Sequence, residues 1–327
     1  MKTITTKQTG LTLVELMVAL AIGSFLMIGA IQIYNQSRQA FVINESIARV
    51  QETAQFAMDT IEADLRMASN WGRNSRGLAV EGRSIIGDAN PNGLPQPGGN
   101  CAADWVLNLA LPIDGVNNGY GLACLATNGS QANSDVITVR RASVAPVDPA
   151  VVGAGRLMIQ TTRIQGEVFE GVVIPVGFSP ADSATHSLIV TSYYVSPAST
   201  LINGVPTLRR HRLIGGGVAG PTIVDEEVAP GIENLQIQLG IDVDADNTVD
   251  RYVNPGDVIY NPTAVGYIPG ARVMTARIWM IVRGVSIEPG LRDARNYRPG
   301  DVVLGVPNDN FRRMQVSKTI LLRNART

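Results

Sequence analysis

One long apolar stretch near the N-terminus limits what this chain can fold into. Residues 11–33 contain no proline and one charged side chain, Glu15. A helix of this length rises ~1.5 Å per residue and reaches ~34 Å, which is enough to cross the hydrocarbon core of a bilayer. Two lysines and no acid precede the stretch. The positive-inside bias therefore places residues 1–10 in the cytoplasm and the chain after about residue 34 on the other side of the membrane.

Glu15 is the unusual feature of this segment. A charged carboxylate inside a membrane helix costs on the order of 3 kcal/mol and is usually partnered. A cut between Gly10 and Leu11 would create a partner, because the new α-amine at Leu11 is a cation that the Glu15 of a neighbouring copy could neutralise. The sequence therefore predicts helices that pack side by side.

The residues around this cut resemble a known signal. Gly10 to Leu16, GLTLVEL, is similar to the class III signal of type IV pilins and type II secretion pseudopilins. The resemblance implies that a prepilin peptidase cuts after Gly10 and methylates Leu11, and that Glu15 is the acid used during assembly. Leu11 departs from the Phe or Met that usually stands first in the mature chain. Gln32 stands where major pilins often carry a proline, which is more like minor pilins.

Two simpler interpretations of the N-terminus stay open. An ordinary secretory signal also has basic residues before an apolar run, and cleavage near Ala30 would remove the helix. A plain signal anchor that holds a periplasmic enzyme fits the same hydropathy. The anchor leaves Gly10 and Glu15 unexplained.

The helical pattern continues beyond the membrane segment. From Tyr34 onward, apolar residues recur at intervals of three, four or seven, and charged residues occupy the other faces. The first proline of the chain is Pro91. We therefore expect one long helix with a transmembrane half at residues 11–34 and an amphipathic half at residues 35–70 that covers a sheet.

Residues 71–327 are expected to form a β-rich domain on the periplasmic or extracellular side. The chain contains 33 glycines and 18 prolines, and short runs rich in Val, Ile and Thr alternate with turn residues. The segment 271–285 is long and partly alternating, which is typical of a central strand, and 215–220 is a glycine-rich loop. The predicted fold class is α+β and pilin-like, with the long N-terminal helix packed on a mostly antiparallel sheet. Strands are expected at 105–111, 135–140, 156–161, 168–176, 187–195, 207–213, 232–241, 271–285 and 315–323.

Two cysteines, Cys101 and Cys124, both lie in the exported part of the chain. In an oxidising periplasm their simplest arrangement is a disulfide, and the closed loop would stabilise the fold by ~3 kcal/mol. Free buried thiols are the alternative. A metal site with two cysteines would need further ligands nearby.

An acidic segment, DVDADNTVD at residues 242–250, is the sharpest candidate site outside the helix. Its carboxylates at the first, third, fifth and ninth positions match a calcium loop, because Ca²⁺ prefers several oxygen ligands from a tightly turned segment. Asn247 replaces the usual glycine at the sixth position, although Asn tolerates a left-handed backbone, and Val253 replaces the acid at the twelfth. An acidic hairpin tip without a cation is the equal alternative. No cofactor is required, and the candidate ligands of a structural Ca²⁺ are Asp242, Asp244, Asp246, Thr248 and Asp250.

Other functional classes have little support in the sequence. The net charge is −1, from Lys+Arg 27 against Asp+Glu 28, so nucleic acid is not an expected partner. His186 and His211 lack a neighbouring catalytic constellation, Asp225 to Glu227 is interpreted as a solvated turn, and no GxSxG or HExxH motif occurs, so an enzyme is not expected. The arginine-rich last third is interpreted as solvated faces or subunit contacts. An adhesive or DNA-capturing module stays an alternative.

Two later segments narrow the resemblance. Residues 228–246 and 320–324 are similar to minor pilins of the PilW type. The resemblance implies a protein that, with other minor pilins and the major pilin, starts a pilus on the inner-membrane assembly platform, supports a tip adhesin and serves twitching motility. It also implies a single-pass inner-membrane protein with a periplasmic domain that later reaches the pilus tip. A minor pseudopilin of type II secretion is the near alternative. Because the topmost subunit would not need Glu15, we expect another minor pilin above this one.

Overall fold

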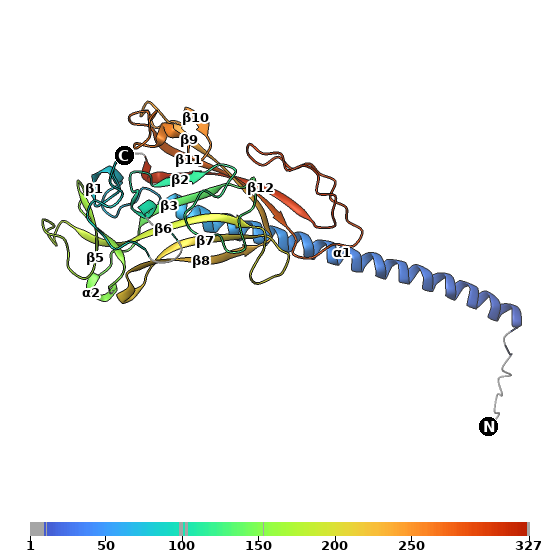
Figure 1. Cartoon of the computed structure of the whole chain (residues 1–327). Coiled ribbons are helices and arrows are strands. Elements are labelled where there is room, and N and C mark those ends of the chain that lie inside the picture. Colours follow the sequence, from blue (N-terminus) through green and yellow to red (C-terminus); the bar gives the residue numbers. More distant parts are fainter. Residues whose placement is uncertain (1–9, 11, 98–100, 102–103, 153, 326–327) are drawn as a thin grey trace, which may run out of the picture. The chain divides into compact units, whose positions relative to one another are not determined.

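The computed structural model describes residues 10, 12–97, 101, 104–152 and 154–325 (Figure 1). The leader up to residue 9 and the predicted methylation site, Leu11, lie outside the described residues. The chain divides into two compact units, Met1–Ala48 and Arg49–Thr327. Helix α1, Leu13–Met67, contributes to both units, and all strands belong to the second.

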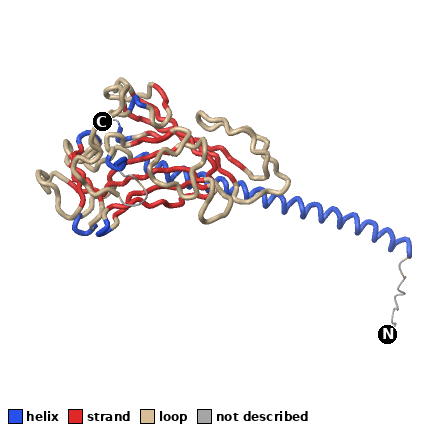
Figure 2. Tube along the Cα trace, viewed as in Figure 1, coloured by secondary structure: helices blue, strands red, loops and turns tan. Residues whose placement is uncertain are grey.

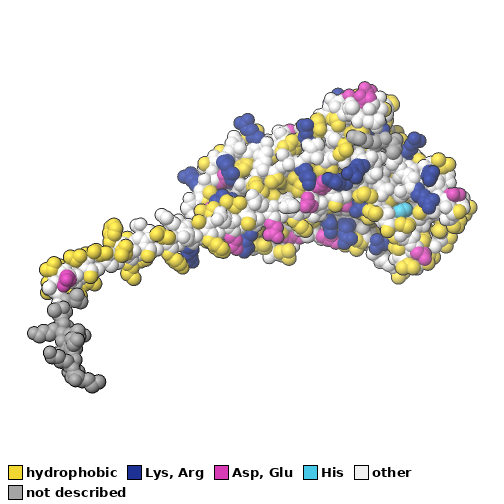
Figure 3. Space-filling view, turned by 180° about the vertical axis from the view of Figure 1, so that it is seen from behind, with side chains coloured by type: hydrophobic (Ala, Val, Ile, Leu, Met, Phe, Trp, Pro, Cys, Tyr) yellow, Lys and Arg dark blue, Asp and Glu magenta, His cyan; other side chains and the backbone are white. Residues whose placement is uncertain are grey.

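In the first unit, α1 exposes large apolar side chains to its surroundings from Leu13 to Tyr34, and again at residues 41–43. Leu13, Phe25 and Leu26 are among its exposed large side chains, and Figure 3 shows the apolar cover. Of the helices in the described part of the chain, α1 alone is long and apolar enough to cross a membrane. A surface of this kind is stable in lipid or against other apolar helices, so it fits a membrane anchor. The bounds of the transmembrane half, residues 11–34, stay a prediction.

In the second unit, α1 buries one face. Its buried apolar residues are spaced three or four apart, so they lie on one side of the helix and form the main core with inward-facing residues of the strands. The helix ends at Met67, slightly before the predicted end, and Ser69 then takes a positive φ of 63°. The buried apolar residues of this face are Val50, Ala54, Ala57, Met58, Ile61 and Leu65.

A four-stranded antiparallel sheet lies on this helix face, with the order β10-β9-β11-β12. Figure 2 shows the strands, in red, lying along the C-terminal part of α1. Leu235, Ile237, Ile278 and Met280 belong to the same core as the buried side of α1. β11 lies between β9 and β12, as the sequence predicts for a central strand. The strands are β9 (Ile232–Asp242), β10 (Arg251–Val253), β11 (Arg272–Arg283) and β12 (Arg313–Leu321).

The second sheet has eight strands. Six follow the order β1-β5-β4-β6-β3-β2, while β7 pairs with β6 and β8 with β7. All pairs are antiparallel except β1 with β5. The long strand β6 is its axis, because it pairs with β3, β4 and β7. The strands are β1 (Val80–Glu81), β2 (Ile113–Val116), β3 (Val136–Ala142), β4 (Leu157–Thr161), β5 (Gly166–Glu170), β6 (Ala184–Ser196), β7 (Thr207–Gly215) and β8 (Pro221–Pro230), and the short helix α2 (Pro149–Val152) precedes β4.

The predicted α+β class is confirmed. The strand expected at 168–176 ends at Glu170, because Gly171 follows with a positive φ of 100°, and two other local predictions are wrong. The stretch 105–111 is not a strand, because Asp104–Leu107 forms a 3-10 helix whose Val106 and Leu107 enter a second core around Trp71. Asp225 to Glu227 is not a turn but part of β8, where Glu226 and Glu227 lie opposite arginines of β7 and Asp225 lies opposite His211. The strand at 105–111 is predicted from apolar content alone. The turn at 225–227 is predicted from its consecutive charges alone, although these residues belong to a strand.

Cys101 and Cys124 form a disulfide, as the sequence predicts, with 4.0 Å between their Cα atoms. Cys124 is buried against the second core, and Cys101 is half-buried beside it. The bond ties two points of a long excursion between α1 and β3 to one apolar cluster. It therefore reduces the conformational freedom of a region with little regular structure.

Candidate functional site

The first turn of α1 holds the predicted assembly acid. The Oε2 atom of Glu15 accepts hydrogen bonds from the backbone nitrogen of Thr12 at 3.0 Å and from its hydroxyl at 2.9 Å. In return, the backbone nitrogen of Glu15 donates to Thr12 Oγ1 at 3.3 Å. This reciprocal pair is a capping box, which satisfies backbone donors that a helix start leaves free.

The capping box fixes where the carboxylate lies. Glu15 is held at the N-terminal end of α1, where the helix dipole favours a negative charge. Gly10, on the amino side of the predicted cut, lies two residues before Thr12 in the sequence. Both bonds from Thr12 use Oε2, and a carboxylate has about four lone-pair sites, so the group can also receive a cation such as an amine.

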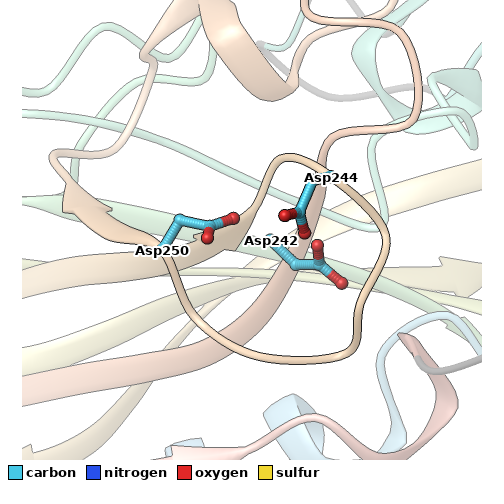
Figure 4. Close-up of side chains that lie close together, drawn as sticks. All are labelled: Asp242, Asp244 and Asp250. Atoms are coloured by element: carbon cyan, nitrogen blue, oxygen red, sulfur yellow. The ribbon is translucent and has the colours of Figure 1, made fainter.

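The second candidate is the turn between β9 and β10, which we call the acidic loop, residues 242–250. Carboxylate oxygens of Asp242, Asp244 and Asp250 lie within 4.8 Å of one another (Figure 4). Asp246 instead accepts hydrogen bonds from Thr248, from its backbone nitrogen and its hydroxyl at 2.7 Å each. The structure thus brings together Asp242, Asp244 and Asp250 of the five predicted ligands. The other two, Asp246 and Thr248, are hydrogen-bonded to each other.

Asp242 already has partners in the acidic loop. Its buried carboxylate accepts hydrogen bonds from the backbone nitrogens of Ala245 at 2.7 Å and Asn247 at 2.9 Å, and it forms an ion pair with Arg272 at 3.2 Å. Burial raises the pKa of Asp242, but these backbone donors and the Arg272 guanidinium outweigh it and hold the pKa below its usual range. Asn247 takes the left-handed conformation at φ 69°, which the sixth position requires.

The fit to Ca²⁺ is therefore partial. Asp244 and Asp250 are exposed acids next to a third carboxylate, so they are the groups that a cation would relieve of repulsion. Arg272 supplies one positive charge to the same cluster. Calcium binding stays a prediction.

Two acids of α1, Glu62 and Asp64, tie the helix to the two sheets. Asp64 of α1 accepts a hydrogen bond from the Tyr193 hydroxyl at 2.7 Å and pairs with Arg141 at 2.8 Å. Glu62, two residues earlier, forms an ion pair with Lys318 of β12. The helical pattern shows that these acids lie off the apolar stripe, but their partners are distant in sequence. Only the tertiary structure identifies them.

The two histidines have structural partners. His186 Nδ1 lies 2.8 Å from the carbonyl oxygen of Ser143, and His211 Nε2 lies 2.6 Å from the Tyr120 hydroxyl. Both side chains are buried, and burial lowers the pKa of His211. Both histidines are therefore buried, hydrogen-bonded residues of the domain interior.

Comparisons with known proteins match both ends of the chain. The prokaryotic N-terminal methylation motif matches residues 5–31, which include Gly10 and Glu15. The family described as type IV pilus-assembly protein W matches residues 192–324, which run from β6 through β12.

Among solved structures, a type IV-like pilin from Thermus thermophilus is similar, with 14% identity and a TM-score of 0.24 over 55% of this chain and 92% of that one. Curated proteins give no significant match. The chain is thus similar to the N-terminal methylation motif over residues 5–31 and to the type IV pilus-assembly protein W family over residues 192–324.

Proposed function

We propose that this protein is a minor pilin of a type IV pilus. A prepilin peptidase cuts between Gly10 and Leu11 and methylates Leu11, and the mature chain enters the pilus at or near its tip, where it helps to start assembly and supports a tip adhesin. The observation that carries the proposal is the position of Glu15, at the start of an exposed apolar helix that continues as the core helix of a domain matched to the PilW family.

The geometry suits a subunit that assembles through its helix. Before assembly, the apolar part of α1 holds the chain in the inner membrane with its domain in the periplasm. During assembly on the membrane platform, helices of neighbouring subunits replace lipid around α1. Glu15, presented by Thr12, then neutralises the α-amine of an adjacent subunit. Because Glu15 is present, another minor pilin sits above this subunit.

Two alternatives have less support. A type II secretion pseudopilin would share the methylation motif, but the second match is to a pilus-assembly family. A DNA-capturing groove would need unpaired basic side chains. Arg272, Arg312 and Arg313 of the arginine-rich last third each form an ion pair with an acid.

The test is substitution of the assembly acid in the native organism. Glu15→Ala should be exported and cut after Gly10 like the wild type, but should reduce surface pili by more than about tenfold, because a membrane-buried amine loses its partner. Glu52→Ala removes an exposed acid farther along the same helix and is the matched control. Mass spectrometry of the mature N-terminus should find methyl-Leu11 in the wild type and both variants.

Two results would contradict this function. Wild-type numbers of surface pili in Glu15→Ala would contradict the proposed role of Glu15 in assembly. A mature chain that begins at Met1 or near residue 31, in cells that have the peptidase, would overturn the processing and the pilus role together.

A further inference from the structure

The last strand, β12, is an open edge of the four-stranded sheet (Figure 1). Within the described residues it pairs only with β11. The register runs without a bulge from Arg313 opposite Arg283 to Leu321 opposite Thr275. The strand contains no proline. Its backbone pairing is therefore regular along its whole length.

Two backbone hydrogen bonds show which atoms face outward. Gly284 donates to the carbonyl of Arg312, and Leu322 donates to that of Met274, so even-numbered residues at both ends of β12 bond toward β11. Bonding alternates along an antiparallel strand, so the odd-numbered residues direct their N–H and C=O groups to the open edge. The carbonyl of Arg313 agrees, because it accepts a hydrogen bond from the Arg295 side chain at 2.6 Å. The outward groups farther along belong to Gln315, Ser317, Thr319 and Leu321, which are all exposed.

The other sheet edges carry features that discourage pairing. β1 and β10 have 2 and 3 residues, and β2 has 4. β8 begins and ends with proline, has an irregular register opposite Leu208 and Arg209, and carries three consecutive acids. Short strands, prolines, bulges and charges are the usual protections of an edge. β12 has 9 residues, no proline and no bulge. Its lysine, Lys318, forms ion pairs with Asp59 and Glu62 of α1.

A groove of about 330 Å³ runs beside β12, with α1 as its other wall. Ala54 and Met58 of α1 and Met314 and Val316 of β12 supply apolar walls. At one end Lys318 pairs with two acids of α1, so the groove offers no uncompensated positive charge. Apolar side chains that alternate along an added strand would enter this groove while its backbone bonds to β12.

The direction of β12 argues against a second copy of this chain. Lys318 pairs with Glu62, and the Asn324 side chain donates to the carbonyl of Ala68 at 3.2 Å, so β12 runs in the same direction as this part of α1. An isologous, antiparallel pairing of two β12 edges would reverse α1 between the copies. Copies held in one membrane enter it from the same side and have the same polarity.

We propose that the open edge of β12 accepts an extended, uncharged segment with apolar residues at alternate positions, contributed by a different pilus subunit. The segment adds a strand to the sheet and places its apolar side chains in the groove. The identity of the partner as a pilus subunit rests on the proposed function, whereas the open edge and the groove are independent of that function.

Proline substitution at an outward-facing position tests the proposal in the native organism. Ser317→Pro removes one outward N–H but no bond to β11, so the domain should fold. Ser317→Ala is the matched control. Each variant also carries Gln55→Cys in the groove, and this cysteine is labelled in intact cells with a maleimide–benzophenone reagent, which on irradiation cross-links to C–H bonds of the peptide beside it. Peptide mass spectrometry then identifies the partner peptide.

In Ser317→Ala, we expect position 55 to cross-link to an extended segment of another pilus subunit. In Ser317→Pro, the yield should fall about tenfold with unchanged thermal unfolding of the domain, because a lost hydrogen bond and the proline ring disturb strand addition. Equal yields in the two variants, a cross-link only to a second copy, or no cross-link to a pilus subunit would overturn the proposal. Cleavage at Gly10 and the dependence of piliation on Glu15 report separately on the proposed function.

Discussion

Asp135 is a buried acid at a junction between the two sheets. It lies just before β3, and its carboxylate accepts hydrogen bonds from the backbone nitrogens of Asn118 at 2.8 Å and Ile237 of β9 at 2.7 Å. Only 1% of its surface is exposed. Burial raises the pKa of Asp135 to about 7, with a contribution from nearby Asp301, although the two backbone donors act in the opposite direction. The sequence gives no sign of this role, because Asp135 resembles an ordinary acid before a strand.

The raised pKa of Asp135 predicts how stability depends on pH. Between about pH 4 and pH 7 the unfolded chain ionises this group while the folded chain keeps its proton, so the free energy of unfolding falls as the pH rises through this window. The slope from one group is at most about 1.4 kcal/mol per pH unit. Urea unfolding of the full chain in detergent should show this slope in the wild type and lose it in Asp135→Asn. Asp182→Asn removes an exposed acid and should keep the slope; an unchanged slope in Asp135→Asn would contradict the assignment.

At the scale of elements, the acidic loop shows how a sequence motif and a fold differ. The spacing of its carboxylates is visible in the sequence, whereas their division into a cluster of three and an internally bonded pair depends on the backbone path between β9 and β10. Arg272, which neutralises Asp242, comes from the neighbouring strand β11. A local motif cannot reveal a competing cation that arrives from elsewhere in the sheet.

The three clustered acids predict which substitutions affect calcium binding. If the acidic loop binds Ca²⁺, Asp244→Asn should weaken binding by about tenfold, because the ion loses a charged ligand. Asp246→Asn should change it little, since Asp246 bonds to Thr248. Isothermal titration with CaCl₂ on the full chain measures both. No binding heat, together with an unfolding temperature that chelator leaves unchanged, would refute the calcium site; equal losses in the two variants would refute the division of ligands.

At the scale of the whole molecule, the two units depend on different surroundings. The buried residues of α1 begin at Val50, and the second unit begins at Arg49. The apolar residues of the first unit are exposed, so they need lipid or other subunits. The second unit has its own core, in which α1 and both sheets meet.

This division predicts that the second unit folds alone. A fragment of residues 49–327 should be monodisperse without detergent and should unfold within about 5 °C of the full chain, because it retains the buried face of α1. A fragment of residues 62–327 lacks Val50, Ala54, Met58 and Ile61 and should fail to fold. Size-exclusion chromatography and circular dichroism distinguish the two. Aggregation of the longer fragment would show that the domain needs the first unit.

The sequence by itself determined the long helix, its membrane half, the acid at its start and most strands. These depend on local properties: hydropathy, periodicity, capping and turn residues act within a few positions of one another. The disulfide is predicted from an expected oxidising compartment and from the presence of only two cysteines. Only the tertiary structure decided that Asp64 and Glu62 bond to different sheets, that three of five acids cluster, and that β12 keeps an open edge. Each of these depends on which distant segments become neighbours, and that is set by the packing of the whole core.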